Sequence, residues 1–372
     1  MKLILAVIIL AFVYFFQKSI YRKYWRKGLE TEVSFSRDFI ECGESAELIE
    51  VVTNNKAMPL PIFHMKFSID KSLKFAESVN ATTTDLYHKN ELFSILGHQR
   101  ITRRHEFTGS ARGIVAVNNA SILVRDFFMT GSYAMRMDHE DVIYVFPKKI
   151  STENFTTYFK GIIGEIEAKR SIVEDALTFR GIREYQPFDS YSSINWKQSA
   201  KARELMVNMY GYTTDSRVRI MLNLDNDVMI ETNKLLEEAI SLASSLARQL
   251  LEKGVSVSVI SNGNDKDGNL LPGVDEGATK QHGIMIDRML TEIKGSEGKE
   301  TFITIVKNEI RAARSNVLYI IISPYARADL MELLDKLNND KTSIRMLVPC
   351  YDEYPYKPER DYAEAWEVPI NV

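Results

Sequence analysis

The residues best suited to chemistry lie between Phe179 and Val207, where charged side chains alternate with aromatic ones. Such a density of acids, bases and rings could form an acid–base site or a surface that recognises a partner. The sequence offers no serine–histidine–aspartate or cysteine–histidine set beside it, which favours a role other than catalysis. The residues singled out in this segment are Arg183, Tyr185, Pro187, Asp189, Trp196 and Lys197.

The competing interpretation of this segment is structural. Asp189 follows Pro187 and precedes Ser190, an order typical of a turn that leads into a short helix reaching about Ala200. In that interpretation Asp189 or Ser190 caps the helix, Trp196 is buried, and the charged groups lock the segment against a sheet. Ion-paired and aromatic clusters serve packing more often than catalysis, so the structural interpretation is favoured.

A second group of candidate residues could bind a divalent cation through oxygen atoms. Asp225 follows the alternating apolar run 218–224, which predicts a strand, and doubly wound sheets bind ligands at the carboxyl ends of their strands. Asp227 lies two residues further on, and Ser323 follows another apolar run at 317–322. Mg²⁺ prefers such oxygen ligands, so Asp225, Asp227 and Ser323 are the candidate metal ligands.

Length, charge and cysteine content limit what the protein can be. The 372 residues predict two folded domains, and 45% hydrophobic with 26% charged residues is a globular composition. Residues 1–27 carry six basic side chains and no acid, which leaves 41 basic against 50 acidic residues in the rest. Such an acidic body excludes a nucleic-acid-binding protein. Cys42 and Cys350 indicate two idle thiols in a reducing compartment rather than a disulfide framework.

The first 27 residues predict a membrane anchor with a basic flank. Residues 3–16 are apolar, and a span becomes feasible when the segment is counted from Met1 to Ile20 with its lysines reaching outward. Bulky residues at 14–16 argue against a cleaved signal peptide, and a buried core helix is the remaining alternative. The basic flank places residues 28–372 in the cytoplasm by the positive-inside rule, so we expect a single-pass protein of the cell membrane.

The elements that must position the candidate residues form two domains. Residues 28–148 contain short β-like runs separated by breakers, which predicts a sandwich-like domain. Residues 149–212 are interpreted as a connector that carries the segment described above. Residues 213–349 alternate strands with helices, which predicts a doubly wound parallel sheet. The tail at 350–372 is aromatic and charged, and its role is not predicted.

The segment from Gly181 to Val207, GIREYQPFDSYSSINWKQSAKARELMV, resembles the signature of the bacterial and archaeal "domain of unknown function 58" family. That signature runs approximately R-x-Y-x-P-G-D-x-x-R-x-I-x-W-x-x-x-A-R-x-x-x-L. Three positions depart from it: Phe188 replaces glycine, Ser192 replaces arginine, and Lys201 replaces another arginine. The matching residues are Arg183, Tyr185, Pro187, Asp189, Ile194, Trp196, Ala200 and Leu205.

The resemblance implies a membrane-anchored β domain followed by a von Willebrand A-like domain, often encoded beside MoxR-type AAA+ ATPases. It brings no assigned enzymatic activity. A von Willebrand A domain would present D-x-S-x-S at Asp225 to bind a cation. This chain has a thioether at Met229 instead, so the metal site is expected to be degenerate.

Three functions remain open from the sequence. The first is a membrane-anchored interaction or scaffold protein that contacts lipid through residues 1–27 and binds a MoxR-type ATPase and other membrane proteins. The second is a divalent-metal-dependent enzyme that uses Mg²⁺ on Asp225 and Asp227. The third is an extracytoplasmic adhesion module, which requires the opposite membrane topology.

Overall fold

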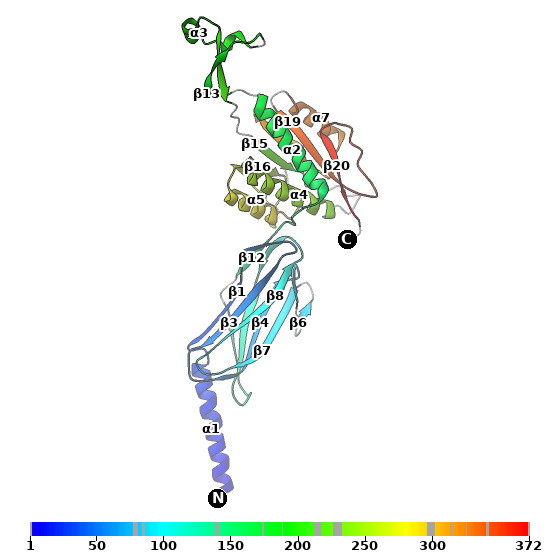
Figure 1. The fold of residues 1–372 in the computed structure, drawn as a ribbon. Coiled ribbons are helices and arrows are strands. Elements are labelled where there is room, and N and C mark those ends of the chain that lie inside the picture. The colour runs from blue at the N-terminus through cyan, green and yellow to red at the C-terminus, as the bar shows by residue number, and fades with distance from the viewer. Residues whose placement is uncertain are drawn as a thin grey trace. The chain divides into compact units, whose positions relative to one another are not determined.

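The computed structural model describes the chain except for residues 1, 77–80, 84–85, 138–140, 173–174, 188, 212–216, 226–232, 296–301, 313, 315, 325, 340–341 and 371–372. The chain divides into two compact units, Met1–Lys148 and Lys149–Val372 (Figure 1). Asp227, one of the predicted metal ligands, and Phe188 lie outside the described residues.

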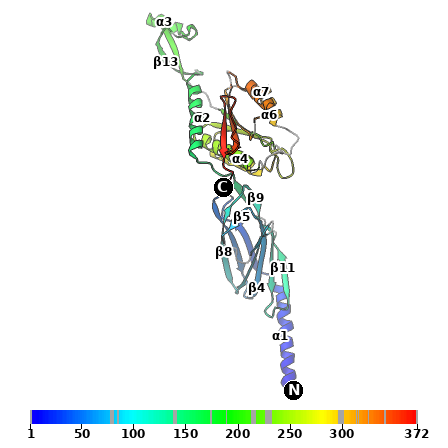
Figure 2. The same cartoon turned by 90° about the vertical axis from the view of Figure 1, so that its right-hand side faces the viewer.

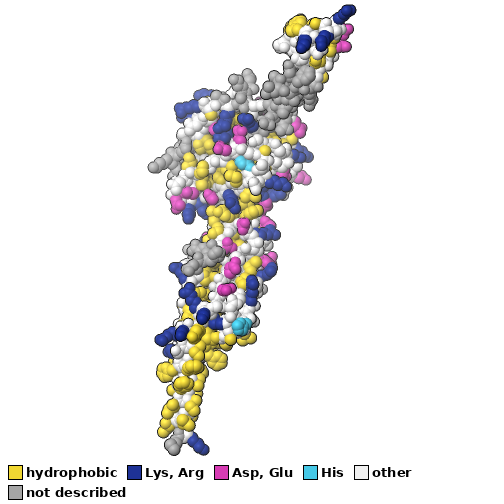
Figure 3. Space-filling model, turned by 90° about the vertical axis from the view of Figure 1, so that its left-hand side faces the viewer, with side chains coloured by type: hydrophobic (Ala, Val, Ile, Leu, Met, Phe, Trp, Pro, Cys, Tyr) yellow, Lys and Arg dark blue, Asp and Glu magenta, His cyan; other side chains and the backbone are white. Residues whose placement is uncertain are grey.

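The first unit begins with helix α1 (Lys2–Tyr24), which is long and apolar enough to span a membrane. Its 23 residues have a mean hydropathy of 2.2 in the most apolar window, and their side chains form a continuous apolar surface (Figure 3). At 1.5 Å per residue the helix is about 35 Å long, against about 30 Å of hydrocarbon in a bilayer. The helix extends beyond the apolar run at residues 3–16 and ends at Tyr24, so that it includes Lys18 and Arg22.

The rest of the first unit is a β-sandwich-like domain, as the short alternating runs predicted. Its core is built from side chains that alternate along each strand, for example Phe63, Met65, Phe67 and Ile69. One sheet has the order β1 (Leu29–Phe35), β3 (Ser45–Asn54), β8 (Gln99–Gly109), β5 (Leu73–Phe75). A second has the order β11 (Ser132–Arg136), β10 (Asn118–Arg125), β4 (Leu60–Asp70), β7 (Leu86–Ile95), β6 (Ala81–Thr83). A third has the order β2 (Phe39–Glu41), β12 (Val142–Phe146), β9 (Gly113–Ala116).

A compact set of charged side chains lies at positions on β3, β7 and β8 where the alternation expects apolar residues. Glu91 contacts Lys89 Nζ at 3.2 Å and Arg103 Nη1 at 2.7 Å. His105 Nε2 lies 3.0 Å from a carboxylate oxygen of the fully buried Glu50, and its Nδ1 contacts Lys89. The carboxylates of Glu50 and Glu91 lie close to the basic side chains of Lys89 and Arg103 in this network. This proximity of opposite charges offsets part of the cost of removing them from water.

The second unit is organised on a six-stranded sheet in the order β17-β16-β15-β18-β19-β20. Strands β15 (Arg217–Leu222), β16 (Ser256–Ser261), β18 (Val317–Ile322) and β19 (Thr342–Tyr351) run parallel, while the edge strand β17 (Val274–Gly277) is antiparallel. The last strand, β20 (Ala363–Val368), pairs in parallel with β19 and buries Trp366. The segment 350–372, interpreted as a separate tail, thus completes the sheet.

Helices cover both faces of this sheet (Figure 2). Helices α4 (Asn233–Glu252) and α5 (Lys280–Glu292) share one core with the sheet, while α6 (Phe302–Ala312) and α7 (Ala328–Leu337) share the other. Helix α2 (Glu153–Ile172) joins the first core through side chains at helical spacing, namely Phe155, Tyr158, Phe159, Ile162 and Ile166. The assignment of this stretch to a connector is corrected by that packing, since α2 is a core helix.

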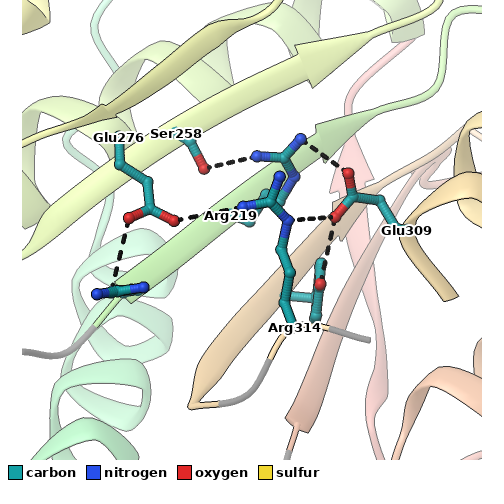
Figure 4. A network of polar contacts seen from close by, with 7 residues as sticks. Arg219, Ser258, Glu276, Glu309 and Arg314 are labelled. Carbon is teal, nitrogen blue, oxygen red and sulfur yellow. Dashed lines mark hydrogen bonds and ion pairs between the residues drawn. The ribbon is translucent and has the colours of Figure 1, made fainter. Parts of the chain in front are cut away.

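A buried ion pair lies between the sheet and α6 (Figure 4). Arg219 on β15 donates to Glu309 at 2.8 Å and to the Ser258 hydroxyl at 3.3 Å. Arg314 and the Tyr319 hydroxyl each lie 3.3 Å from the other Glu309 oxygen. Burial, reinforced by the Glu309 carboxylate, raises the pKa of Tyr319 to about 12. Tyr319 therefore stays protonated and donates its hydrogen.

We expect Glu309→Ala to lower the unfolding temperature of the second unit strongly, because Arg219 would remain buried without its carboxylate. Breaking a buried pair in this way costs about 3–5 kcal/mol. Thermal unfolding of the detergent-solubilised full chain, followed by circular dichroism, measures the effect. Asp335→Ala is the matched control, because Asp335 and its partner Arg360 are 38% and 42% exposed and such a pair contributes about 0–1 kcal/mol. Equal losses in both variants would contradict the expectation.

Candidate functional site

The signature segment forms a hairpin of β13 (Asp175–Glu184) and β14 (Met206–Gly211) that carries two short helices between its strands, η1 (Tyr191–Ser193) and α3 (Trp196–Ala202). The Arg183 guanidinium donates two parallel hydrogen bonds of 2.6 Å to the Asp189 carboxylate, and the Gln186 backbone amide donates to the same carboxylate at 2.8 Å. These donors, with Arg183 first, hold the pKa of Asp189 below its ordinary value. The turn is therefore closed by an ionised carboxylate at neutral pH.

The structural interpretation named Asp189 or Ser190 as the cap of a helix reaching about Ala200, and Asp189 caps neither helix. Ser190 caps η1, and Asn195, which the sequence analysis did not single out, caps α3 by accepting from the Gln198 amide at 3.0 Å. The Asn195 amide also donates to Asn208 on β14 at 2.7 Å. Asn195 precedes Gln198 by three residues, a spacing typical of a capping box, and this pattern could have predicted the start of α3.

Trp196 is exposed, contrary to the other part of the structural interpretation. Its side chain is 66% exposed and that of Tyr191 73%, while the ring of Tyr191 stacks on Tyr185 with centroids 6.0 Å apart. Pro187 and Lys197 are also exposed. The hairpin thus combines an ion pair with exposed aromatic and basic side chains. Hydrophobic, basic and acidic side chains are seen together at the top of Figure 3. We call Tyr191, Trp196 and Lys197 the hairpin surface.

The predicted metal residues Asp225 and Ser323 lie at the carboxyl ends of the neighbouring strands β15 and β18, as expected. Between them is Asn223, whose amide donates to the Ser323 hydroxyl at 3.0 Å and whose oxygen accepts from the Asp225 amide at 3.0 Å. The Asn262 amide donates to Asp225 at 2.5 Å, and the Phe302 amide also donates to that carboxylate. Burial raises the pKa of Asp225 above its ordinary value.

These described residues do not fit a divalent cation well. Mg²⁺ requires an octahedron of oxygen ligands, but the oxygens of Asp225, Asn223 and Ser323 already accept hydrogen bonds from amide groups. Within the described part of the chain, no three histidine, cysteine or acidic side chains group as metal ligands. The local arrangement is a hydrogen-bonded network of amides that ties β15, β16 and β18 together.

A cavity of about 680 Å³ lies between α2, α4 and the strands β19 and β20. Arg345 reaches Glu165 at 2.9 Å and Glu364 at 3.1 Å there, and the Trp366 ring nitrogen donates to Glu238 at 3.0 Å. Tyr158 lines the cavity, and burial followed by the Glu364 charge raises its pKa. Sequence reasoning missed this cavity because its lining comes from α2 and the C-terminal segment, both of which were assigned outside the α/β domain.

Comparison with known proteins identifies no family. No family description and no curated protein matches the chain. Similar solved structures include a cohesin module from a Clostridium perfringens family 33 glycoside hydrolase, with 6% identity, a TM-score of 0.23, and 32% of this chain and 96% of that chain covered. A non-cellulosomal cohesin from Archaeoglobus fulgidus has 10% identity and a TM-score of 0.21, with 35% and 97% covered. The CARDB domain of PF1109 from Pyrococcus furiosus has 14% identity and a TM-score of 0.21, with 32% and 93% covered. Similarity at this level supports no conclusion about function.

We expect Mg²⁺ to leave the unfolding temperature of the full chain unchanged, because the oxygens of Asp225, Asn223 and Ser323 are held by hydrogen bonds from protein amides. A ligand present at about 100 times its dissociation constant would stabilise the fold by about 2.7 kcal/mol, an effect that thermal unfolding in Mg²⁺ and in a chelator detects. A Mg²⁺-dependent rise in the unfolding temperature that Asp225→Asn abolishes would restore the metal site.

Proposed function

We propose that this chain is a membrane-anchored interaction protein of the "domain of unknown function 58" type, which binds partner proteins through the hairpin surface. The observation that carries the proposal is the exposure of Trp196 and Tyr191 on a turn closed by Arg183 and Asp189. Tryptophan and tyrosine side chains are enriched among the residues that dominate binding energy in protein interfaces.

The architecture supports the same proposal. The sheet order, with β15 and β18 in the centre and helices on both faces, agrees with a doubly wound, von Willebrand A-like domain. We propose a MoxR-type AAA+ ATPase as the partner, on the strength of the signature in the hairpin. A metal-dependent enzyme is less well supported, because the described residues around Asp225 bind one another.

We expect the double variant Tyr191→Ala, Trp196→Ala to bind a purified MoxR-type AAA+ ATPase from the same genome at least about tenfold more weakly than the native chain. Truncating dominant interface residues costs about 2 kcal/mol or more. Biolayer interferometry on the detergent-solubilised full chain, in ATP and in ADP, measures the affinity.

The control for this variant is Tyr354→Ala, which removes an aromatic side chain that is 74% exposed outside the hairpin. Binding that neither variant weakens would reject the hairpin surface. Failure of the native chain to bind the ATPase in either nucleotide would reject the partner.

We propose that residues 28–372 are cytoplasmic, because the basic flank follows α1. Cys350 is 7% exposed and therefore a poor reporter of topology. A suitable reporter is Lys266→Cys, which lies in an exposed loop, in a chain with both native cysteines changed to serine. We expect this cysteine to react with a membrane-impermeant maleimide in lysed cells but not in intact cells. Labelling in intact cells would place the domains outside and favour the adhesion module.

A further inference from the structure

The loop between β10 and β11 presents three consecutive apolar side chains to the surroundings of the first unit. Phe127 is 63% exposed, Phe128 47% and Met129 61%. A run of exposed large apolar side chains at a hairpin tip is unfavourable in water and marks a contact surface. We call residues 127–129 the apolar tip.

The polar groups of this loop turn inward and bind one another. Asp126 is fully buried, and its carboxylate accepts from the Thr130 amide at 2.8 Å and from the Thr130 hydroxyl at 3.1 Å. The Met129 amide donates to the Asp126 carbonyl at 3.0 Å, and the Asp126 amide donates to the Gly131 carbonyl at 3.2 Å. A side chain at position 131 would lie 2.8 Å from the Asp126 carboxylate, so only glycine allows this closure. Polar groups that are hydrogen-bonded within the loop in this way cost less to remove from water than unpaired ones.

The loop also lies against the membrane helix α1. The Tyr133 hydroxyl donates to the Lys18 carbonyl at 3.4 Å, and the Tyr133 ring stacks on Trp25 with centroids 5.9 Å apart. The Phe128 ring lies with its centroid 6.4 Å from that of Tyr14. Along the helix, Tyr14 lies one turn beyond Lys18 in the direction away from the β domain.

The depth of the apolar tip follows from these contacts. When α1 spans the bilayer, a hydrocarbon core of about 30 Å takes up about 20 of its residues. Counted from Lys2, that core reaches to about Tyr21, and Tyr14 then lies about 10 Å inside its boundary. A ring beside Tyr14 is therefore below the headgroups, and the apolar tip continues the lipid-facing surface of α1.

We propose that the apolar tip inserts into the acyl-chain region of the same bilayer leaflet that α1 leaves, as a second membrane contact. Tyr133 and Trp25 then occupy the interface, where aromatic rings with a polar end are favoured. Two contacts fix the orientation of the β domain on the membrane, which a single helix leaves free to rotate. The inference rests on the proposed membrane span, and it is independent of the partner and of the side on which the domains lie.

The test places an environment-sensitive fluorophore at one cysteine at a time in the full chain, with Cys42 and Cys350 changed to serine, in phosphatidylcholine vesicles. Phe12→Cys marks the lipid-facing helix, and Ala111→Cys marks an exposed site beyond the far end of β8. We expect the label at Phe127→Cys to be blue-shifted and quenched by doxyl lipids, as at position 12. Arg125→Cys, at the base of the loop, should give intermediate quenching, so that the gradient reports the protein rather than the label.

A label at position 127 that aqueous iodide quenches as strongly as at position 111, while position 12 remains in lipid, would overturn the insertion and leave the membrane span intact. Loss of lipid quenching at position 12 as well would overturn the span and the insertion together.

Discussion

Burial of both faces of a parallel sheet is the constraint on which the second unit depends. All six residues of β18 are buried, so helices must cover the sheet on each side, and any polar group on either face needs a partner. Arg219 meets this requirement through Glu309 and Ser258, and the amides of Asn223 and Asn262 meet it where the strands end. The place where doubly wound sheets commonly hold ligands is used here to join strands.

The hairpin at 175–211 is stabilised differently from the sheet. Its charged residues hold the turn from inside, because Arg183 and Asp189 are matched in geometry and charge. Its largest rings, those of Tyr191 and Trp196, face outward, so the ion pair and the exposed aromatic surface lie within a few residues of each other. Of the structural interpretation, the ion pair is present, whereas Trp196 is exposed instead of buried.

Much of the fold could be predicted from periodicity. The apolar run at 317–322 and the alternation at 63–69 carry their structure in local pattern, and the strands are present where the pattern places them. The pattern failed at α2 and β20, because residues such as Tyr158 and Trp366 become core residues only through contacts distant in sequence. The exposure of Trp196 was not predictable for the same reason, because burial depends on the whole fold and the local sequence does not show whether a tryptophan faces the core or the solvent. Asp225 and Ser323 lie at the strand ends where the sequence placed them, but the amides that bind them were not expected.

The position of β20 in the sheet has a consequence for synthesis. Ribosomes deliver a chain from its amino end, and domains generally fold as units in that order. Helix α1 and the β-sandwich-like domain are complete when Phe146 has been made, whereas the α/β sheet waits for Ala363–Val368. The nascent protein is therefore half folded while one edge of β19 is still unpaired, and exposed strand edges of this kind are prone to aggregation.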